Sequence, residues 1–170
     1  MYNNMNDAFY ELLVPQKASL KDILSVIFIS AGIILLTLIG FSFIGFYAAI
    51  IGAAGFGALA YFLLPRLKKE HEYYLLNYTL EISLIENKAN RKSLMEFDIR
   101  KAEVVAPFGS DRLSGFRPTK TLDFSSGTKN NNVYSIIIPY DHDLCNILIE
   151  PDETMKEQMK FWLAQKMYLI

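Results

Sequence analysis

The distribution of apolar residues divides the chain into one long apolar segment and a longer amphipathic remainder. Residues 23–65 contain no charged side chain, and the nearest charges on either side are those of Asp22 and Arg66. A helix of that length would extend about 65 Å, roughly twice the ~30 Å hydrocarbon core of a bilayer. A single crossing would leave half of the apolar run in water. The pattern therefore predicts two membrane crossings.

The reversal between the two crossings is predicted at residues 40–45 (GFSFIG), near the middle of the run. Glycine adopts the backbone conformations that a tight turn needs. This divides the predicted transmembrane hairpin, residues 22–66, into helices at about 22–40 and 46–65. A cleavable signal peptide is the alternative, because residues 58–60 (ALA) resemble a cleavage site. The apolar run is, however, much longer than the apolar part of a signal peptide.

Basic residues at the two ends of the hairpin predict its orientation. Lys17 and Lys21 precede the hairpin, Arg66, Lys68 and Lys69 follow it, and the turn carries no charge. Segments rich in lysine and arginine stay on the cytoplasmic side when a membrane protein inserts. We therefore expect a multi-pass protein of the cell membrane with both termini in the cytoplasm.

Small residues recur at every fourth position of the second predicted helix and indicate a helix-packing face. They are Gly45, Ala49, Ala53 and Gly57. Small side chains let helix backbones approach closely in lipid, where no hydrophobic effect drives association. This face is expected to pack against the first helix, or alternatively against a second copy of the chain or another membrane protein. Neither helix contains an ionisable residue, which argues against a channel or transporter that acts alone.

The first 21 residues precede the hairpin and are predicted to lie at the membrane surface. Residues 7–14 end at Pro15 and place several apolar side chains on one side of a helix. Proline cannot continue a helix, so a short helix would end there. Residues 1–21 are therefore predicted to be an interfacial segment that contains one short helix.

Residues 71–170 are predicted to be a cytoplasmic antiparallel β domain. Apolar and polar residues alternate over residues 73–85, which is typical of one long half-buried strand. Its apolar positions are Tyr74, Leu76, Tyr78, Leu80, Ile82 and Leu84. The other predicted strands, which complete a meander of about six, are residues 95–99, 103–107, 120–125, 133–139 and 144–150. Residues 108–119 form the longest predicted loop, where binding sites often lie.

A C-terminal helix is predicted at residues 152–168. Acidic residues stand near its start and lysines follow, which suits the helix dipole. Apolar residues recur at every fourth position, namely Met155, Met159, Leu163 and Met167, with Trp162 beside them. Such a face packs against a core far more often than it binds a ligand, so the helix should cover the sheet and Trp162 should be mostly buried.

Candidate catalytic and metal-binding residues are few. Residues 141–143 (DHD) offer metal ligands, but consecutive residues in a tight turn point in different directions. Ser125 or Ser126 with His142 could form a serine-hydrolase pair, yet no nucleophile motif accompanies them. No catalytic, cofactor-binding or metal-binding residue is therefore assigned, and the protein is not expected to be an enzyme or to need a cofactor.

Charge and cysteine content restrict the possible partners. The net charge is −1, and basic and acidic residues are balanced after the hairpin, so no surface for nucleic acid is expected. Cys145 is the single cysteine, which excludes a disulfide within the chain and suits a reducing cytoplasm. The expected partners are the lipid bilayer and either another protein or a second copy of the chain.

Several runs of residues resemble an uncharacterised family of small bacterial membrane proteins, known as a domain of unknown function. Besides the two predicted helices, these runs are residues 5–7 (MND), 72–77 (EYYLLN), 80–82 (LEI), 97–99 (FDI), 121–127 (TLDFSSG) and 150–155 (EPDETM). The resemblance implies two membrane spans and a cytoplasmic domain of the pleckstrin-homology (PH) type. In that fold two small antiparallel sheets, usually of seven strands in all, form a barrel capped by a C-terminal helix. It implies no catalytic residue.

Three functional hypotheses follow. The leading one is a membrane-tethered, non-enzymatic interaction or scaffold module that recruits or senses a protein at the inner face of a bacterial membrane. The alternative is a sensor of anionic lipid headgroups. Its contacts would be Arg66, Lys68 and Lys69, joined by Arg112, Arg117 and Lys120. The remote alternative is a hydrolase.

Overall fold

The computed structural model describes residues 9–64, 67–88, 90–128 and 132–169. The described residues fall into two compact units. The helical unit comprises residues 17–69 and 86–90, and the β unit comprises the other described residues. The β unit therefore contains the segment before the helices as well as the segment after them.

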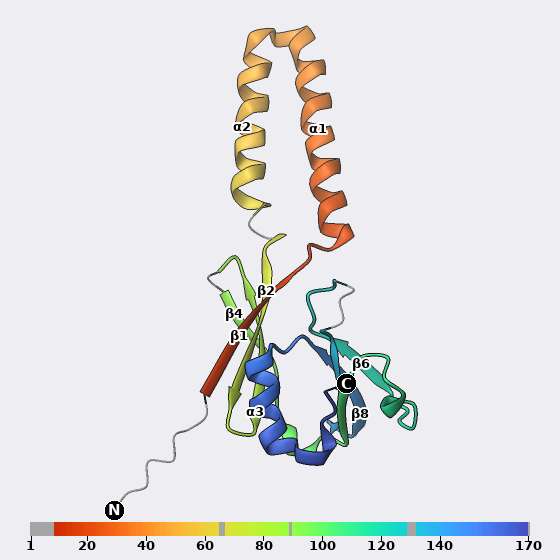
Figure 1. Ribbon diagram of the computed structural model, residues 1–170. Helices are drawn as coiled ribbons and strands as arrows, with labels where there is room; N and C mark the ends of the chain where they lie inside the picture. Colours follow the sequence, from red (N-terminus) through yellow and green to blue (C-terminus); the bar gives the residue numbers. More distant parts are fainter. Residues whose placement is uncertain (1–8, 65–66, 89, 129–131, 170) are drawn as a thin grey trace, which may run out of the picture. The chain divides into compact units, whose positions relative to one another are not determined.

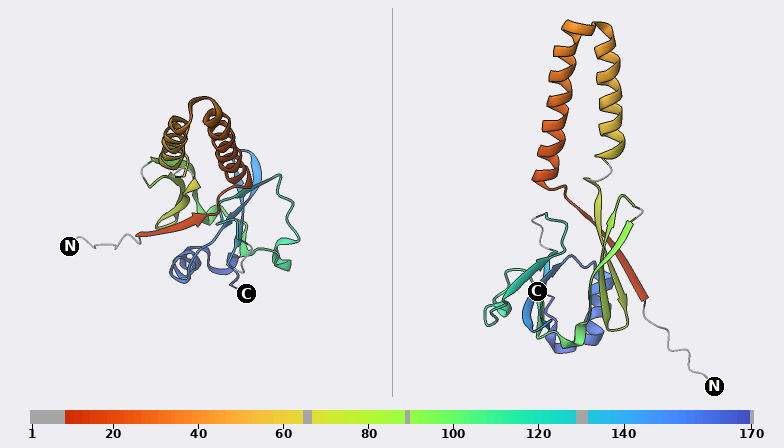
Figure 2. Two further views of the ribbon diagram at one scale, coloured as in Figure 1. Left: turned by 90° about the horizontal axis from the view of Figure 1, so that it is seen from above. Right: turned by 180° about the vertical axis from the view of Figure 1, so that it is seen from behind.

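Two helices that run side by side in opposite directions form most of the helical unit (Figure 1). Helix α1 spans Leu20–Ile44 and helix α2 spans Phe46–Phe62. Gly45 alone separates them, with φ 57° and ψ −133°, a conformation that glycine adopts without strain. Figure 2 shows the same pair from two further directions.

The turn predicted at residues 40–45 is therefore too long, because α1 continues through Gly40 to Ile44. Glycine within a helix costs only about 1 kcal/mol relative to alanine. Here it also permits a close approach, since a Cβ atom on Gly40 would lie 3.3 Å from the Cβ of Ala48 in α2. Among the described residues α1 is the one helix long and apolar enough to cross a membrane, whereas α2 has 17 residues.

The first sheet of the β unit has the strand order β1-β2-β3-β4. Its strands are β1 Phe9–Gln16, β2 Lys69–Leu76, β3 Thr79–Glu86 and β4 Asn90–Asp98. The short helix predicted at residues 7–14 is wrong over the described part, because that part is the edge strand β1. Tyr10, Leu12 and Val14 alternate toward the core, and this period of two takes precedence over the helical spacing once β2 is available as a partner. Residues 9–16 thus belong to the first sheet rather than to a separate interfacial segment, and residues 1–8 of that predicted segment lie outside the described residues.

The long strand predicted at residues 73–85 is two strands joined by a turn at Asn77 and Tyr78. Asn77 has φ 53°, which asparagine tolerates better than most residues. The turn also changes which side chains face inward: β3 buries Leu80 as predicted, but β2 buries Tyr73 and Leu75 rather than Tyr74 and Leu76. The alternation in the sequence runs through the turn unbroken, so it conceals the reversal.

The second sheet has the order β5-β7-β8-β6. Its strands are β5 Val104–Pro107, β6 Lys120–Asp123, β7 Tyr134–Tyr140 and β8 Asp143–Ile149. β6 pairs with β8 in parallel, while β7 pairs antiparallel with both β5 and β8. The predicted six-stranded meander is wrong: the described residues form two four-stranded sheets. Short 3₁₀ helices at Ile99–Lys101 and Asp111–Leu113 lie in the connections of this part of the chain.

Helix α3, Glu153–Leu163, completes the core of the β unit. Its N-cap, Asp152, accepts a hydrogen bond from the backbone N–H of Met155 at 2.8 Å. The four predicted apolar positions, Met155, Met159, Leu163 and Met167, are all buried in one cluster with residues of both sheets. α3 ends earlier than predicted, at Ala164 with φ 48°, and a 3₁₀ helix at Ala164–Lys166 follows. Trp162 is half-buried rather than mostly buried.

Candidate functional site

The contact between α1 and α2 depends on Gly52 of α2, which leaves room for the polar side chain of Thr37 in α1. A Cβ atom on Gly52 would lie 2.9 Å from Cγ2 of Thr37, closer than such atoms ever approach. The Thr37 hydroxyl donates a hydrogen bond to the carbonyl of Ile33 at 2.7 Å, so its polarity is satisfied inside α1. Ala48, Gly52 and Leu59 are the buried residues of α2.

The predicted packing face of Gly45, Ala49, Ala53 and Gly57 is the neighbouring face. Gly45 forms the turn, Ala53 is exposed, and a Cβ atom on Gly57 would meet nothing within 4 Å. The interpretation that this face packs against the first helix is therefore wrong. Small residues form two neighbouring rows along α2. The direction of the backbone at Gly45 determines which of the two rows faces α1. Association of this face with a second copy or another membrane protein stays a prediction.

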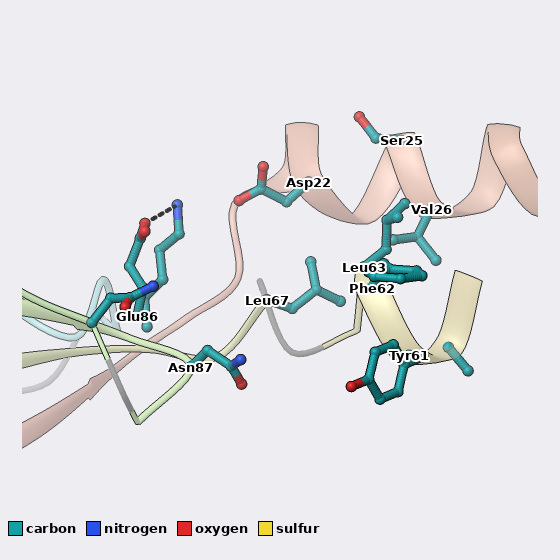
Figure 3. A pocket seen from close by; sticks show the side chains of 12 residues that line it. Asp22, Ser25, Val26, Tyr61, Phe62, Leu63, Leu67, Glu86 and Asn87 are labelled. Atoms are coloured by element: carbon teal, nitrogen blue, oxygen red, sulfur yellow. Dashed lines mark ion pairs between the residues drawn. The ribbon is translucent and has the colours of Figure 1, made fainter. Parts of the chain in front are cut away.

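A cleft of about 980 Å³ lies in the helical unit at the open ends of α1 and α2, where Figure 3 shows its lining side chains. Val26 of α1, Phe62 at the end of α2, and Leu63 and Leu67 after it supply an apolar wall. A polar wall opposite comprises Lys69, Glu86, Asn87 and Asn90, with Asp22 and Ser25 at the start of α1. The cleft therefore joins an apolar surface to a group of charged side chains.

The charges of the cleft do not cancel. Lys69 Nζ lies 3.6 Å from Oε1 of Glu86, a loose ion pair. Asp22 is half-buried and has no hydrogen bond or ion pair among the described residues. Of the two carboxylates that line the cleft, Glu86 thus faces the one ammonium, and Asp22 is unpaired among the described residues. The Ser25 hydroxyl donates to the Lys21 carbonyl at 2.8 Å and is already engaged within α1.

The basic residues predicted to contact lipid headgroups do not form one surface in the β unit. Arg112 lies over the ring of Tyr168, 4.8 Å from its centroid. Lys120 forms an ion pair with Asp143, and this interaction raises the pKa of Lys120 and lowers the pKa of Asp143. Arg117 is exposed. Arg112 is thus stacked on a ring, Lys120 is paired with an acid and Arg117 is simply exposed. These three cations form no cluster.

The three basic residues predicted beside the hairpin have separate outcomes. Arg66 lies outside the described residues, and Lys68 is exposed. Lys69 begins β2 and is held by Glu86 in the cleft. The structure therefore gives one of the three a defined partner, and that partner is an acid on a neighbouring strand.

The hydrolase pair of Ser125 or Ser126 with His142 is not brought together. β6 runs parallel to β8 with Asp123 opposite Leu148, so the serines that follow lie beside the far end of β8. His142 precedes β8, about 25 Å away at the rise of a strand. The Ser125 hydroxyl donates to Asp123 at 2.6 Å, and the Ser126 hydroxyl donates to Glu150 at 2.8 Å. Both hydroxyls serve to hold the loop after β6.

The segment Asp141-His142 is the turn between β7 and β8. Both residues have positive φ, 49° and 68°, the geometry of a two-residue hairpin loop. No group of three or more potential metal ligands occurs among the described residues. The interpretation of this segment as a polar turn is therefore confirmed.

His71 is a buried residue of β2, although its position just after the apolar run favours a place at the membrane interface. Its imidazole lies edge-on to Phe124, with ring centroids 5.7 Å apart, and its Nδ1 has no partner among the described residues. Burial lowers the pKa of His71, and hydrogen bonding to the backbone of Phe124 and Ser125 only partly opposes this. His71 is thus an uncharged part of the core at neutral pH.

Tyr73, two residues further along β2, connects the first sheet to the second. Its hydroxyl donates to the carbonyl of Phe124 at 2.6 Å and accepts from the backbone N–H of Glu150 at 3.3 Å. Burial raises the pKa of Tyr73. One side chain of β2 therefore fixes the ends of both β6 and β8.

A group of aromatic residues lies at the surface beside the β2–β3 turn. The Arg100 guanidinium stands 3.4 Å from the centroid of the Tyr78 ring, and Trp162 meets the same ring edge-on at 5.5 Å. Phe161 contacts Trp162 and is 78% exposed. Asp98 accepts hydrogen bonds from the Arg100 guanidinium on both of its carboxylate oxygens, which fixes the arginine and lowers the pKa of Asp98. This aromatic surface combines an exposed phenylalanine with a fixed cation.

Comparison with known protein families matches residues 6–169 to the model described as a bacterial PH-like domain (DUF6106). No curated protein and no solved structure matches the chain. The match includes the helices as well as both sheets and α3. It confirms the resemblance to a PH-like family of unknown function, while the number of membrane spans stays a prediction. The chain belongs to the bacterial PH-like family DUF6106.

Proposed function

We propose that this protein is a membrane-tethered, non-enzymatic interaction module, in which α1 and α2 both cross the membrane and the PH-like unit recruits or senses a protein in the cytoplasm. The single observation that carries the proposal is the outer surface of the two helices. From Ile23 onward it carries no charged side chain and exposes large apolar side chains along its length, including Leu36 at 71%, Phe43 at 82% and Phe46 at 74%. A contiguous apolar surface of this size marks an interaction with lipid or protein.

Both helices are expected to insert together. α1 would extend about 38 Å and α2 about 26 Å, lengths that bracket the ~30 Å hydrocarbon core. Because Gly52 and Thr37 hold the two helices in contact, inserting α1 alone would leave α2 apolar and exposed to water. The lysines at both ends of the pair support a cytoplasmic location of both termini under the positive-inside rule.

Topology is tested by labelling introduced cysteines in intact cells with an impermeant thiol reagent. Native Cys145 is 2% exposed, so Cys145→Ala provides a background without a slow-reacting thiol. In that background Ser42→Cys, near the turn, should label from outside, and Ser114→Cys, in the β unit, should label only after lysis. Labelling of Ser114→Cys in sealed cells would contradict the orientation.

The aromatic surface of Tyr78, Arg100, Phe161 and Trp162 is the best-formed candidate for the protein contact. Interfaces are enriched in aromatic residues and arginine at their centres. In-cell photo-crosslinking from position 161 should capture a protein, while position 157, on the same helix and also exposed, should capture much less. Equal capture at both positions would contradict this assignment.

Sensing of anionic lipid is the second candidate, favoured by the exposed Phe108 and Arg117 on the loop before β6. The isolated segment 71–170 is unsuitable for the test because it lacks β1. A glycine-serine linker in place of residues 17–68 keeps β1 beside β2. Flotation of this variant with vesicles containing anionic lipid, but not with neutral ones, would favour the sensor.

A further inference from the structure

We propose that the cleft at the open ends of α1 and α2 binds the primary ammonium group of an aminophospholipid headgroup, with the lipid chain along its apolar wall. This inference rests on the proposed membrane insertion of the hairpin. It differs from the anionic-headgroup hypothesis, because here the protein supplies carboxylates and the ligand supplies the cation.

Shape supports an amphipathic ligand. The cleft has a volume of about 980 Å³, large enough for a headgroup and the first part of its chains. Figure 3 shows Val26, Leu63 and Leu67 on the side toward the helices and Glu86 and Asn87 on the other side. The apolar wall continues the exposed apolar surface of the hairpin, so a lipid lying against the helices would have its headgroup at the polar wall.

Charge selects the headgroup. The carboxylate of Asp22 is half-buried and unpaired among the described residues, and Glu86 is only loosely paired to Lys69 at 3.6 Å. Among the described lining residues two carboxylates outnumber one ammonium, so an anionic headgroup would meet an excess of negative charge from them. A primary ammonium can donate hydrogen bonds to both Asp22 and Glu86, and it would release Lys69 toward the adjacent phosphate. The amides of Asn87 and Asn90 offer further donors for phosphate oxygens.

The test uses the full chain in mild detergent, incubated with an equimolar mixture of phosphatidylethanolamine, phosphatidylcholine and phosphatidylglycerol that share the same acyl chains. Native mass spectrometry then counts the lipids bound by headgroup. We expect phosphatidylethanolamine to exceed each competitor about threefold to fivefold, the value of one partly exposed ion pair. Phosphatidylcholine is the informative competitor, because its ammonium carries the same charge without an N–H donor.

Variants separate the cleft from general lipid binding. Asp22→Asn and Glu86→Gln should each reduce the preference toward equal binding, and Asp22→Glu should keep it. Glu157→Gln, an exposed acid on α3 that does not line the cleft, is the matched control and should behave like the wild type. Circular dichroism of each variant shows whether the helices are retained, and an unfolded Asp22→Asn protein leaves Glu86→Gln to decide.

A lipid headgroup and a free amphipathic amine share the recognised chemistry. Dodecylamine should therefore displace phosphatidylethanolamine more effectively than dodecyl phosphate does, and the mass of the species that co-purifies identifies the natural source. Equal binding of the three lipids would overturn this inference but not the proposed membrane insertion. So would an unchanged preference for phosphatidylethanolamine in both Asp22→Asn and Glu86→Gln. Retention of no lipid of any class would overturn the proposed membrane insertion as well.

Discussion

Replacement of Tyr73 by phenylalanine removes one oxygen atom that holds the two sheets together. The Tyr73 side chain is 0% exposed, and its hydroxyl bonds to the Phe124 carbonyl at 2.6 Å and the Glu150 N–H at 3.3 Å. Phenylalanine keeps the ring and its packing but leaves both backbone groups without this partner. A buried polar group that loses its partner costs about 1–3 kcal/mol, so the variant should unfold at a clearly lower denaturant concentration.

The assay follows from the composition. Trp162 is the only tryptophan, and it lies on α3, so its fluorescence reports unfolding of the β unit alone. Urea titration of the full chain in mild detergent gives the free energy of unfolding of that unit. Tyr74→Phe is the matched control: Tyr74 is the next residue of β2, lies half-buried on the opposite face, and contacts Phe9 by its ring.

The control should change the unfolding free energy by less than about 0.5 kcal/mol, as is usual for surface substitutions. A loss in Tyr73→Phe no greater than that of Tyr74→Phe would refute the reasoning, because it would mean that water replaces the lost bonds at no cost. The same hydroxyl predicts alkaline behaviour. Burial raises the pKa of Tyr73 in the folded state, so its contribution is complete below the ordinary pKa of 10.0 and is lost as pH rises above it.

Three further predictions concern the helices, His71 and Trp162. Gly52→Val should force Thr37 away and destabilise the helix pair by about 1–3 kcal/mol in detergent titrations followed by circular dichroism, whereas Ala53→Val, on the outer face, should change little. Burial lowers the pKa of His71 in the folded state, so the β unit should lose stability as pH falls below the unfolded value of 6.5; a His71→Leu variant with the same acid dependence would contradict this. Trp162→Ala should cost about 2 kcal/mol by circular dichroism during urea unfolding, less than the loss for a fully buried aromatic, and an unshifted midpoint would show that the Tyr78 contact contributes nothing.

Several features could be predicted from the sequence because local physical chemistry decides them. The charge-free run from Ile23 onward is long enough for two apolar helices, whatever the exact position of the turn between them. The four-residue spacing of apolar residues from Met155 produces a helix with one buried face. Asp141 and His142 form a two-residue turn between two strongly apolar strands. In each case the sequence pattern and the structural element that it predicts lie in the same short segment.

Other features depended on which segments meet. Residues 9–16 satisfy a helical spacing and a strand spacing equally well, and pairing with β2 decides between them. The unbroken alternation over residues 73–85 does not reveal the turn at Asn77, because β2 has apolar residues on both faces and so hides the change of the inward face from odd to even positions. Both errors concern long-range pairing, which a single segment does not record.

The candidate site follows the same division. The charges at the ends of the apolar run were evident from the sequence, but their pairing was not. Lys69 meets Glu86 because β2 and β3 are neighbours in one sheet, whereas Asp22 forms no ion pair among the described residues. Likewise, Gly52 rather than Ala53 faces α1, because the path of the chain through Gly45 sets the rotation of α2. Composition and periodicity determined which segments are helical, apolar or alternating; only the tertiary structure decided which faces and charges come together, since those contacts join residues far apart in the chain.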